Sequence, residues 1–490
     1  REAPSQLIAY EAPDNALVRE GEDPSVTKVK VGFVPLHRVP FDEEWARELK
    51  HRFIEAVRAS FGDIVELVYP GEGDTKLGLV SDDDDAEAVA ELFKRERVDS
   101  IVIAALTFGD ELAGARVAEL LRKPVMIYAT KEPPPLPGGF RRSDSFCGTL
   151  SLASALYRRK IPFVFGGIVY PEDPEFKRSF DSFVRAVNAV KTFVGAKVGA
   201  VGPRPERFET VTFNEAVMAA KFSQRVVHFD LIEVVEEARR LSDSDPRVAK
   251  TIGEIEAQLD VSGVTREALL KLAKLEVVLS ELAERRKLVG MGVRCWTELE
   301  RYFGVTPCLV MGRLTDKGVM MACEVDVYGV LTMALQYAAS LGKTVPFFID
   351  WTIRHPTRDN VFLAWHCGNL PLSLCSGGCR LSFHGVMHRA LGAERCYGTV
   401  DGRAKPGEVT ISRLVEYDGE FKLFVTRGRI VEEPGEFRGS WAWVEVPDLD
   451  KVYTTLIEEG FIHHASMIHG DIVEPLKMAA KLLDIKAVVV

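Results

Sequence analysis

The 490-residue sequence has no run of about 18 apolar residues, the shortest length typical of a membrane-spanning helix. It also lacks a dense basic stripe, because its 62 Lys and Arg are outnumbered by 72 Asp and Glu, for a formal charge of −10. Nucleic-acid binding requires clustered positive charge, so we expect neither a nucleic-acid nor a membrane partner. Residues 1–27 are polar and acidic and lack the apolar segment of a signal peptide, which favours a cytoplasmic protein. The chain begins without Met, so a processed start stays open.

Paired Cys-x2-Cys knuckles, typical of structural zinc sites, are also absent. Most of the eight cysteines fall in apolar, strand-like segments, which favours buried free thiols in a reducing compartment. One stretch places Cys375 and Cys379 shortly before His384 and His388. A structural zinc site there is the weaker alternative.

The chain is too long for one hydrophobic core, so two to four domains are expected. The first part alternates short apolar runs with helical periodicity. Uninterrupted apolar strands between helices are typical of a parallel sheet buried on both faces. The predicted strands are 28–35, 64–69, 100–106 and 124–128, and the predicted helices are 41–61, 86–97, 110–121 and 149–157.

A second α/β unit is predicted to begin with a strand at 161–169, and the chain changes character again from about residue 395. There, alternating Val, Thr and Phe predict antiparallel strands. The predicted strands of this last part are 409–415, 420–426, 428–432 and 441–446. We therefore predict an α/β fold with two Rossmann-like parallel-sheet domains and a C-terminal domain with an antiparallel β-barrel. The predicted domain ranges are 1–165, 166–340 and 341–490.

Three positions carry a ligand-capable side chain where the pattern expects an apolar one. Glu324 interrupts an apolar strand, Asp350 ends another, and the pair His463-His464 is followed by apolar residues. A carboxylate rarely enters such surroundings unless it is paired or bound to metal. Two carboxylates and an imidazole suit Mn²⁺, Mg²⁺ or Fe²⁺. Taken singly, each residue also fits an ordinary structural role as a cap, a turn residue or a core histidine.

Several short motifs combine these positions. Together they resemble the L-fucose isomerase family, which is related to the bacterial L-arabinose isomerases, and the resemblance is strongest over about residues 290–490. The matching segments are Cys295-Trp296, Pro307-Cys308, Arg313-Leu314-Thr315-Asp316-Lys317-Gly318, Cys323-Glu324-Val325-Asp326, Asp350, Trp365-His366-Cys367-Gly368-Asn369, Pro406-Gly407-Glu408-Val409-Thr410 and His463-His464, with Gly202-Pro203-Arg204-Pro205 as a local match earlier in the chain.

The resemblance implies a metal-dependent aldose–ketose isomerase for L-fucose/D-arabinose-type sugars, working through an ene-diol. It implies one Mn²⁺ held by Glu324, Asp350 and His464, with the two carboxylates also moving protons. His463 or His469 could replace His464 as the imidazole ligand. His366 is a second-tier ligand or a support for the metal site.

Substrate contacts are expected from aromatic and cationic side chains. Trp441 and Trp443 share one strand face and could stack on a sugar, although a core position is the alternative. The resemblance also implies that an N-terminal arginine, here Arg38, reaches a neighbouring subunit's site, which requires a homo-trimer or homo-hexamer. A non-catalytic sugar-binding or regulatory protein on the same scaffold is the rival function. Sugar binding without turnover, unaffected by a chelator, would favour that rival.

Overall fold

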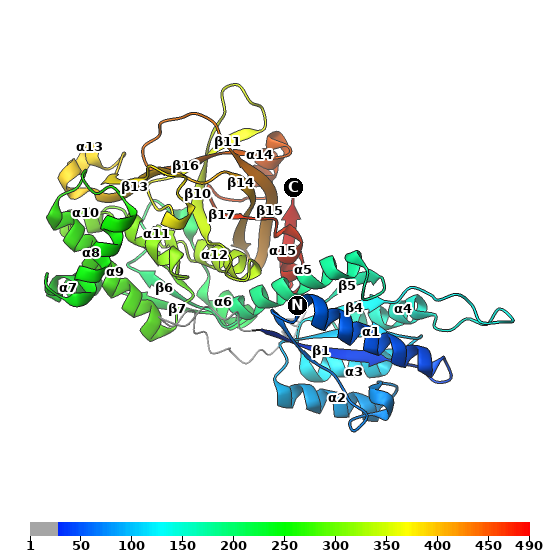
Figure 1. Ribbon diagram of the computed structural model, residues 1–490. Helices are drawn as coiled ribbons and strands as arrows, with labels where there is room; N and C mark the ends of the chain where they lie inside the picture. Colours follow the sequence, from blue (N-terminus) through cyan, green and yellow to red (C-terminus); the bar gives the residue numbers. More distant parts are fainter. Residues whose placement is uncertain (1–27) are drawn as a thin grey trace. The chain divides into compact units, whose positions relative to one another are not determined.

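The computed structural model describes residues 28–490, so the expectations for residues 1–27 lie outside the described residues. The described chain forms two compact units (Figure 1). Unit 1 contains residues 28–191 and Lys477–Ile485, and unit 2 contains Thr192–Leu476 and Lys486–Val490. Across the described part, no helix is both long and apolar enough to cross a membrane.

Unit 1 is built on a five-stranded, fully parallel sheet in the order β2-β1-β3-β4-β5. Every residue of β3 and β4 is buried, which explains why these strands read as uninterrupted apolar runs. The first predicted parallel sheet is thereby confirmed. Its strands are β1 (Val29–Leu36), β2 (Val65–Val68), β3 (Ser100–Ala105), β4 (Val125–Ala129) and β5 (Phe163–Ile168).

Helices cover both faces of this sheet. Helix α1 meets α5 through aromatic rings, as where Phe53 packs edge-on against Phe176 and Phe180. Helix α2 packs on α3 and α3 on α4, and Figure 1 shows α2 and α3 on the side of the sheet away from α1. The helices are α1 (Glu43–Phe61), α2 (Asp83–Glu96), α3 (Glu111–Leu121), α4 (Ser145–Arg158) and α5 (Pro174–Phe193).

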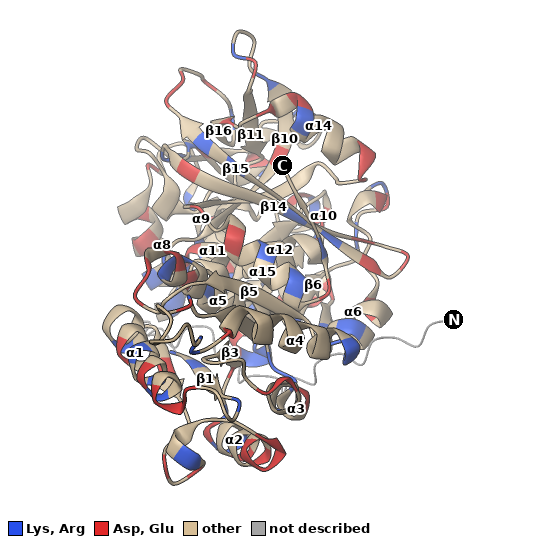
Figure 2. Cartoon of the chain, turned by 90° about the vertical axis from the view of Figure 1, so that its right-hand side faces the viewer, with Lys and Arg blue, Asp and Glu red and all other residues tan. Residues whose placement is uncertain are grey.

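Charge placement explains where α2 begins and ends. The Asp82 side chain accepts a hydrogen bond from the Asp85 backbone N–H and so caps the helix. Three aspartates follow in the first turn and two basic residues occupy the last turn, matching the helix dipole (Figure 2). The helix predicted at 86–97 is confirmed, but the aspartate cap starts it three residues earlier, at Asp83.

Strand β5 corrects one prediction. The strand predicted at 161–169 was expected to open the second α/β unit, but β5 pairs in parallel with β4 and completes the first sheet. Periodicity identifies a strand but not its partner, so the sequence could not assign it to a sheet.

Unit 2 contains a second parallel sheet, in the order β7-β6-β8-β9. Helix α12 packs on β6, β8 and β9 and also on β10, β14 and β17 of a larger sheet. All but one of its 13 residues are buried for this reason. The strands of the smaller sheet are β6 (Lys197–Val201), β7 (Arg225–Phe229), β8 (Gly290–Val293) and β9 (Met320–Cys323). The helices of this part are α6 (Glu215–Phe222), α7 (Leu231–Arg240), α8 (Pro246–Gln258), α9 (Arg266–Arg286), α10 (Glu298–Tyr302), α11 (Cys308–Asp316) and α12 (Val327–Ala339).

The larger sheet has nine strands in the order β12-β13-β16-β11-β10-β17-β14-β15-β18. Strand β15 also pairs with β16, in the antiparallel sense. Two further pairs, β13 with β16 and β15 with β18, are parallel, so the sheet is mixed. Strands β13 and β18 extend the sheet beyond the β15–β16 pair. The predicted antiparallel barrel is not confirmed. The strands are β10 (Pro346–Arg354), β11 (Val361–His366), β12 (Arg380–Phe383), β13 (Tyr397–Arg403), β14 (Gly407–Tyr417), β15 (Glu420–Val431), β16 (Ser440–Glu445), β17 (His464–His469) and β18 (Lys486–Val489). The remaining helices are α13 (His388–Leu391), α14 (Leu449–Glu458) and α15 (Val473–Leu482).

Two cysteines depart from the expected free thiols. Cys375 and Cys379 form a disulfide, with their Cα atoms 6.3 Å apart. Gly377 and Gly378 both have positive φ, which lets the intervening chain turn back within four residues. Because both sulfurs are bonded to each other, the zinc alternative at this pair is wrong. Five of the other six cysteines are buried and free, and Cys147 is exposed.

Helix α10 buries a carboxyl group that has no hydrogen-bond partner. Glu300 is fully buried, both of its carboxylate oxygens are unpaired among the described residues, and burial raises its pKa to about 8. An acid whose pKa is higher in the folded state binds more protons there. Glu300 therefore costs increasing stability as pH rises from its ordinary pKa of 4.5 through about 8.

Glu300→Gln should remove this pH-dependent cost. One pKa unit corresponds to about 1.4 kcal/mol, so with a pKa raised from 4.5 to about 8 we expect the variant to gain about 3.5 kcal/mol more relative to wild type at pH 8 than at pH 5. Denaturant unfolding of both proteins at the two pH values measures the difference. An equal offset at both pH values would contradict the prediction. Glu298→Gln in the same helix, which removes a partly exposed carboxylate paired with Arg294, is the matched control.

Candidate metal centre

Glu324 lies in a tight turn between β9 and α12. Glu324 and Val325 both have left-handed backbone conformations, with φ of 52° and 61°, which are unfavourable for a β-branched residue such as Val325. Asp326 then caps α12 by accepting a hydrogen bond from the Gly329 N–H. This turn holds the Glu324 side chain, only 3% exposed, at the carboxyl end of the parallel sheet.

Asp350 and His464 come from neighbouring strands of the nine-stranded sheet. Asp350 of β10 stands directly opposite His464 of β17 in the antiparallel register. Directly opposed residues on one sheet face lie within side-chain contact of each other. The pairing therefore joins two positions that sequence spacing alone could not connect.

The three side chains converge on one point. His464 Nε2 lies 3.2 Å from Glu324 Oε2 and 3.7 Å from Asp350 Oδ1. Both of these oxygens are buried without a hydrogen-bond partner among the described residues. Ligand atoms around a divalent cation at about 2.1 Å are separated by roughly 3 Å. The donor types, their spacing and the unpaired oxygens thus fit a cation bound among them.

A buried charge network fixes the orientation of His464. Its Nδ1 lies 2.8 Å from Asp326 Oδ2, and Arg413 donates to both Asp326 oxygens at 2.5 and 3.0 Å. Burial opposes ionisation of Asp326, but the Arg413 charge and the His464 hydrogen bond outweigh it and hold the pKa of Asp326 below its ordinary value. Since Nδ1–H donates to this carboxylate, the lone pair of neutral His464 lies on Nε2, the atom that faces Glu324 and Asp350.

Without a cation, the same surroundings favour a proton on His464 Nε2. Burial lowers the pKa of His464, but its hydrogen bond to Asp326 and the neighbouring carboxylates of Glu324 and Asp350 raise it to about 10. Burial raises the pKa of Asp350 to about 7, with Glu324 adding to the rise and His464 opposing it. A cation at Nε2 would take the place of that proton.

His366 has the opposite arrangement of its ring nitrogens. Its Nδ1 accepts a hydrogen bond from the Cys367 backbone N–H at 2.9 Å. Burial, then the neighbouring His464 and His463, lowers the pKa of His366 well below its ordinary value, so the ring is neutral and its hydrogen lies on Nε2. That Nε2 is 4.0 Å from Asp350 Oδ1. This hydrogen-bond pattern favours His366 as a donor beside the centre over His366 as a metal ligand.

The other two histidines considered for the centre lie differently. His463 is exposed and offers a ring nitrogen within 4.8 Å of donor atoms of Asp350 and His464. His469 bonds through Nε2 to the Lys405 carbonyl at 2.9 Å.

The remaining predicted substrate contacts lie outside the cluster around Glu324. Trp441 and Trp443 are 5% and 4% exposed and pack with Val361 and Leu363 in an apolar cluster, which is the core position considered as the alternative. Arg38 belongs to unit 1, where it pairs with Asp110 and Glu111 and lies over the Phe108 ring.

Sequence reasoning missed several neighbours of the centre. Asp326 stood in a matching motif without an assigned role, and Arg413 lay unremarked in a predicted strand. Cys295 donates to Glu324 Oε1 at 3.5 Å, and buried His384 accepts at Nδ1 from the backbone N–H groups of Val386 and Met387. A charged Arg413 inside an apolar strand was the one available signal for this network.

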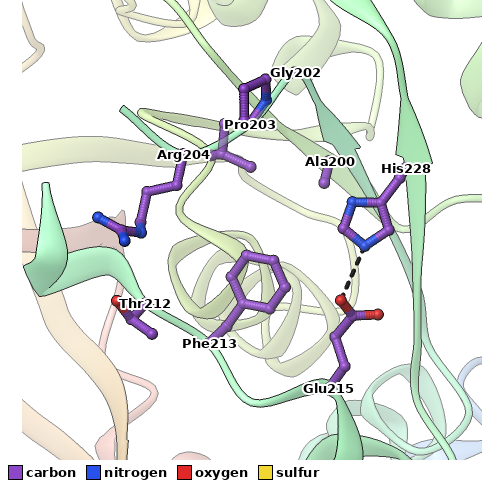
Figure 3. Close-up of a pocket in the computed structure, with 9 residues that line it drawn as sticks. Ala200, Gly202, Pro203, Arg204, Thr212, Phe213, Glu215 and His228 are labelled. Carbon is purple, nitrogen blue, oxygen red and sulfur yellow. Dashed lines mark hydrogen bonds and ion pairs between the residues drawn. The ribbon is translucent and has the colours of Figure 1, made fainter. Parts of the chain in front are cut away.

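A separate pocket of about 260 Å³ opens beside this centre, at the carboxyl ends of β6 and β7 (Figure 3). Val325, the neighbour of Glu324, lines it together with Arg204 and Phe213. His228 and Glu215 hydrogen-bond across one side of it at 2.9 Å. Clefts at this edge of parallel sheets are typical ligand sites, so the Gly202-Pro203-Arg204 turn forms part of a candidate ligand-binding surface.

Comparison with known proteins gives matches at both ends of the chain. A family model described as the fucose/sulfoquinovose isomerase N-terminal domain matches residues 32–194, and one described as the L-fucose isomerase C-terminal domain matches residues 364–490. Sulfoquinovose isomerases from Priestia aryabhattai and Priestia megaterium are each 24% identical over 463 residues, covering 93% of this chain and 97% of the relative. A sulfoquinovose isomerase from Alkalicoccus urumqiensis is 24% identical over 398 residues, covering 80% of this chain and 86% of the relative.

The two matched domains belong to one kind of enzyme, and the full-length relatives carry the match across the region between them. The chain belongs to the fucose isomerase family and is an isomerase of the intramolecular oxidoreductase class.

Proposed function

We propose that this chain is a metal-dependent aldose–ketose isomerase in which Glu324, Asp350 and His464 hold one divalent cation, with Mn²⁺ as the first choice. The observation that carries the proposal is the approach of His464 Nε2 to a buried, unpaired oxygen of each of the two carboxylates. Two carboxylates and one imidazole favour a cation that also accepts sugar oxygens.

The reaction moves one proton between C1 and C2 and another between O1 and O2. A bound cation supplies charge stabilisation for the two sugar oxygens. Asp350 would take the C–H proton on its second carboxylate oxygen and return it to the adjacent carbon, because Oδ1 is the oxygen that faces the proposed cation site. His366 Nε2–H lies 4.0 Å from Asp350 Oδ1 and can donate to a sugar oxygen as negative charge develops there. Glu324 and the Asp326-bound His464 hold the centre in place.

Two classes of sugar are proposed as substrates. The relatives that cover nearly the whole chain are sulfoquinovose isomerases, which makes sulfoquinovose the first sugar to test. L-Fucose and D-arabinose are the second class, supported by the motifs of residues 290–490 and by the C-terminal family match. All of these aldoses present the same reacting C1–C2 end.

Chelation and metal return test the proposal. The purified chain is treated with a chelator, assayed for ketose formation with the three sugars, and assayed again after adding Mn²⁺, Mg²⁺ or Zn²⁺. We expect chelation to lower turnover by at least about a hundredfold and Mn²⁺ to restore it, because several kcal/mol of charge stabilisation depend on the cation. Turnover that survives exhaustive chelation would overturn the metal dependence. Ketose from none of the three sugars, with metal present, would overturn the proposed substrate classes.

A further inference from the structure

Four buried free thiols gather on one side of Glu324. Cys295, Cys308, Cys323 and Cys367 line one small space together with Glu324 and His384. None of the four thiols is more than 8% exposed. They come from four places in the chain, so the fold and not local sequence assembles the cluster.

Three of these groups already have the spacing of metal ligands. One ligand atom each from Cys295, Cys323 and Glu324 lies within 4.8 Å of the others. In a tetrahedral site with metal–sulfur bonds of about 2.3 Å, ligand atoms are roughly 3.8 Å apart. Small side-chain shifts would therefore bring these three atoms around one ion, with Cys308 or His384 available as a fourth ligand.

The space among these side chains is too small for a water molecule. An organic ligand cannot enter it, whereas a bare cation that replaces thiol hydrogens can. Thiolate sulfur selects soft cations such as Zn²⁺ and Cd²⁺ over Mn²⁺ and Mg²⁺, which prefer carboxylate and imidazole ligands. The two sides of Glu324 thus present different chemistry, with sulfur on one side and Asp350 and His464 on the other.

We propose that Cys295, Cys323 and Glu324 form a binding site for a thiophilic divalent cation of the Zn²⁺ or Cd²⁺ type, separate from the Glu324, Asp350 and His464 centre. On binding, the two thiols each release a proton to solvent and form a sulfur–metal bond, with no change of oxidation state. Because Glu324 belongs to both sites, occupation of the sulfur site inhibits the enzyme. That inhibitory consequence rests on the proposed function, whereas the binding itself does not.

Cadmium titration tests the site directly. The chelator-treated chain, with its disulfide intact, is titrated with Cd²⁺ and followed by the ultraviolet charge-transfer absorption of cadmium–thiolate bonds. We expect this absorption to saturate at one Cd²⁺ per chain and to disappear in Cys295→Ser and Cys323→Ser. Cys396→Ser is the matched control, because Cys396 is equally buried but does not line the space, and it should titrate like wild type.

Two further measurements separate this site from the proposed catalytic centre. Asp350→Asn should keep the cadmium–thiolate absorption, since Asp350 takes no part in the sulfur site. With Mn²⁺ present, Cd²⁺ should inhibit wild type at a concentration at least about tenfold lower than it inhibits Cys323→Ser, each compared with its own uninhibited rate. Absorption that persists in both folded serine variants, or its absence from wild type, overturns the site. Equal inhibition of wild type and Cys323→Ser overturns its inhibitory role.

Discussion

Asp350→Asn and Glu324→Gln are each expected to lower kcat by about a thousandfold or more while leaving the fold intact. The amides keep the shape of the side chains but remove a negative ligand, and at position 350 also the group proposed to move the C–H proton. Loss of a general base alone typically costs 10²- to 10⁴-fold, and loss of the cation adds to that. Assay of both variants with saturating Mn²⁺ and sugar measures the effect.

The controls for these two variants address folding and charge. Asp471→Asn neutralises an exposed aspartate that pairs with Arg427 just after β17, and it should keep near-wild-type turnover. Metal content after dialysis should fall for both site variants and stay unchanged for the control. Turnover within tenfold of wild type in both site variants would remove Glu324 and Asp350 from the mechanism.

Stability gives a second way to read these variants. Asp350 and Glu324 are buried close together with little compensation other than His464. Replacing one carboxylate by a neutral amide reduces the desolvation of charge, so neither variant should unfold more easily than wild type without metal. If the two carboxylates are metal ligands, the variants should lose activity without losing free energy of unfolding.

The sequence predicted the elements of the fold better than their partners. Uninterrupted apolar runs such as β3 and β4 were recognisable because both faces of a parallel sheet are buried. Which sheet β5 joins, and how β13 and β18 extend the large sheet, depend on pairing between distant segments. That pairing is set by tertiary packing and leaves no periodic signal, so the predicted barrel and the start of the second unit could not be tested before the structure.

The same limit applies to the candidate site. Glu324, Asp350 and His464 were detectable because each is polar in an apolar stretch, and the motifs joined them. The orientation of His464 was not predictable, since it depends on the long-range contact between Asp326 and Arg413. The sequence also could not predict that the Nε2 atom of His464 carries a lone pair whereas that of His366 carries a hydrogen. Each tautomer is set by the hydrogen bond that the folded chain makes to Nδ1 of that ring.

Arg413 is expected to contribute more to stability than any exposed arginine of the nine-stranded sheet. Its guanidinium and the Asp326 carboxylate are each only 1% exposed. Removing one partner of a buried ion pair leaves the other charge uncompensated and typically costs about 3–5 kcal/mol. Arg413→Met should lower the free energy of unfolding by that amount, measured by denaturant titration at neutral pH.

A double variant that also removes the Asp326 charge shows how much of the lost stability comes from that uncompensated charge. In Arg413→Met/Asp326→Asn, the buried position 326 is neutral, still accepts from the Gly329 N–H that begins α12, and still faces His464 Nδ1. We expect the double variant to recover more than half of the lost stability. It should nevertheless bind Mn²⁺ at least about 10- to 100-fold more weakly, because the amide NH2 then faces His464 Nδ1 and favours the tautomer that carries its hydrogen on Nε2, the atom proposed to bind the cation. Arg427→Met, which removes an exposed pair with Asp471, is the matched control and should change stability by less than about 1 kcal/mol. Equal losses in Arg413→Met and Arg427→Met would show that the buried pair has no special role, whereas recovered stability with weakened metal binding would show that the pair orients His464.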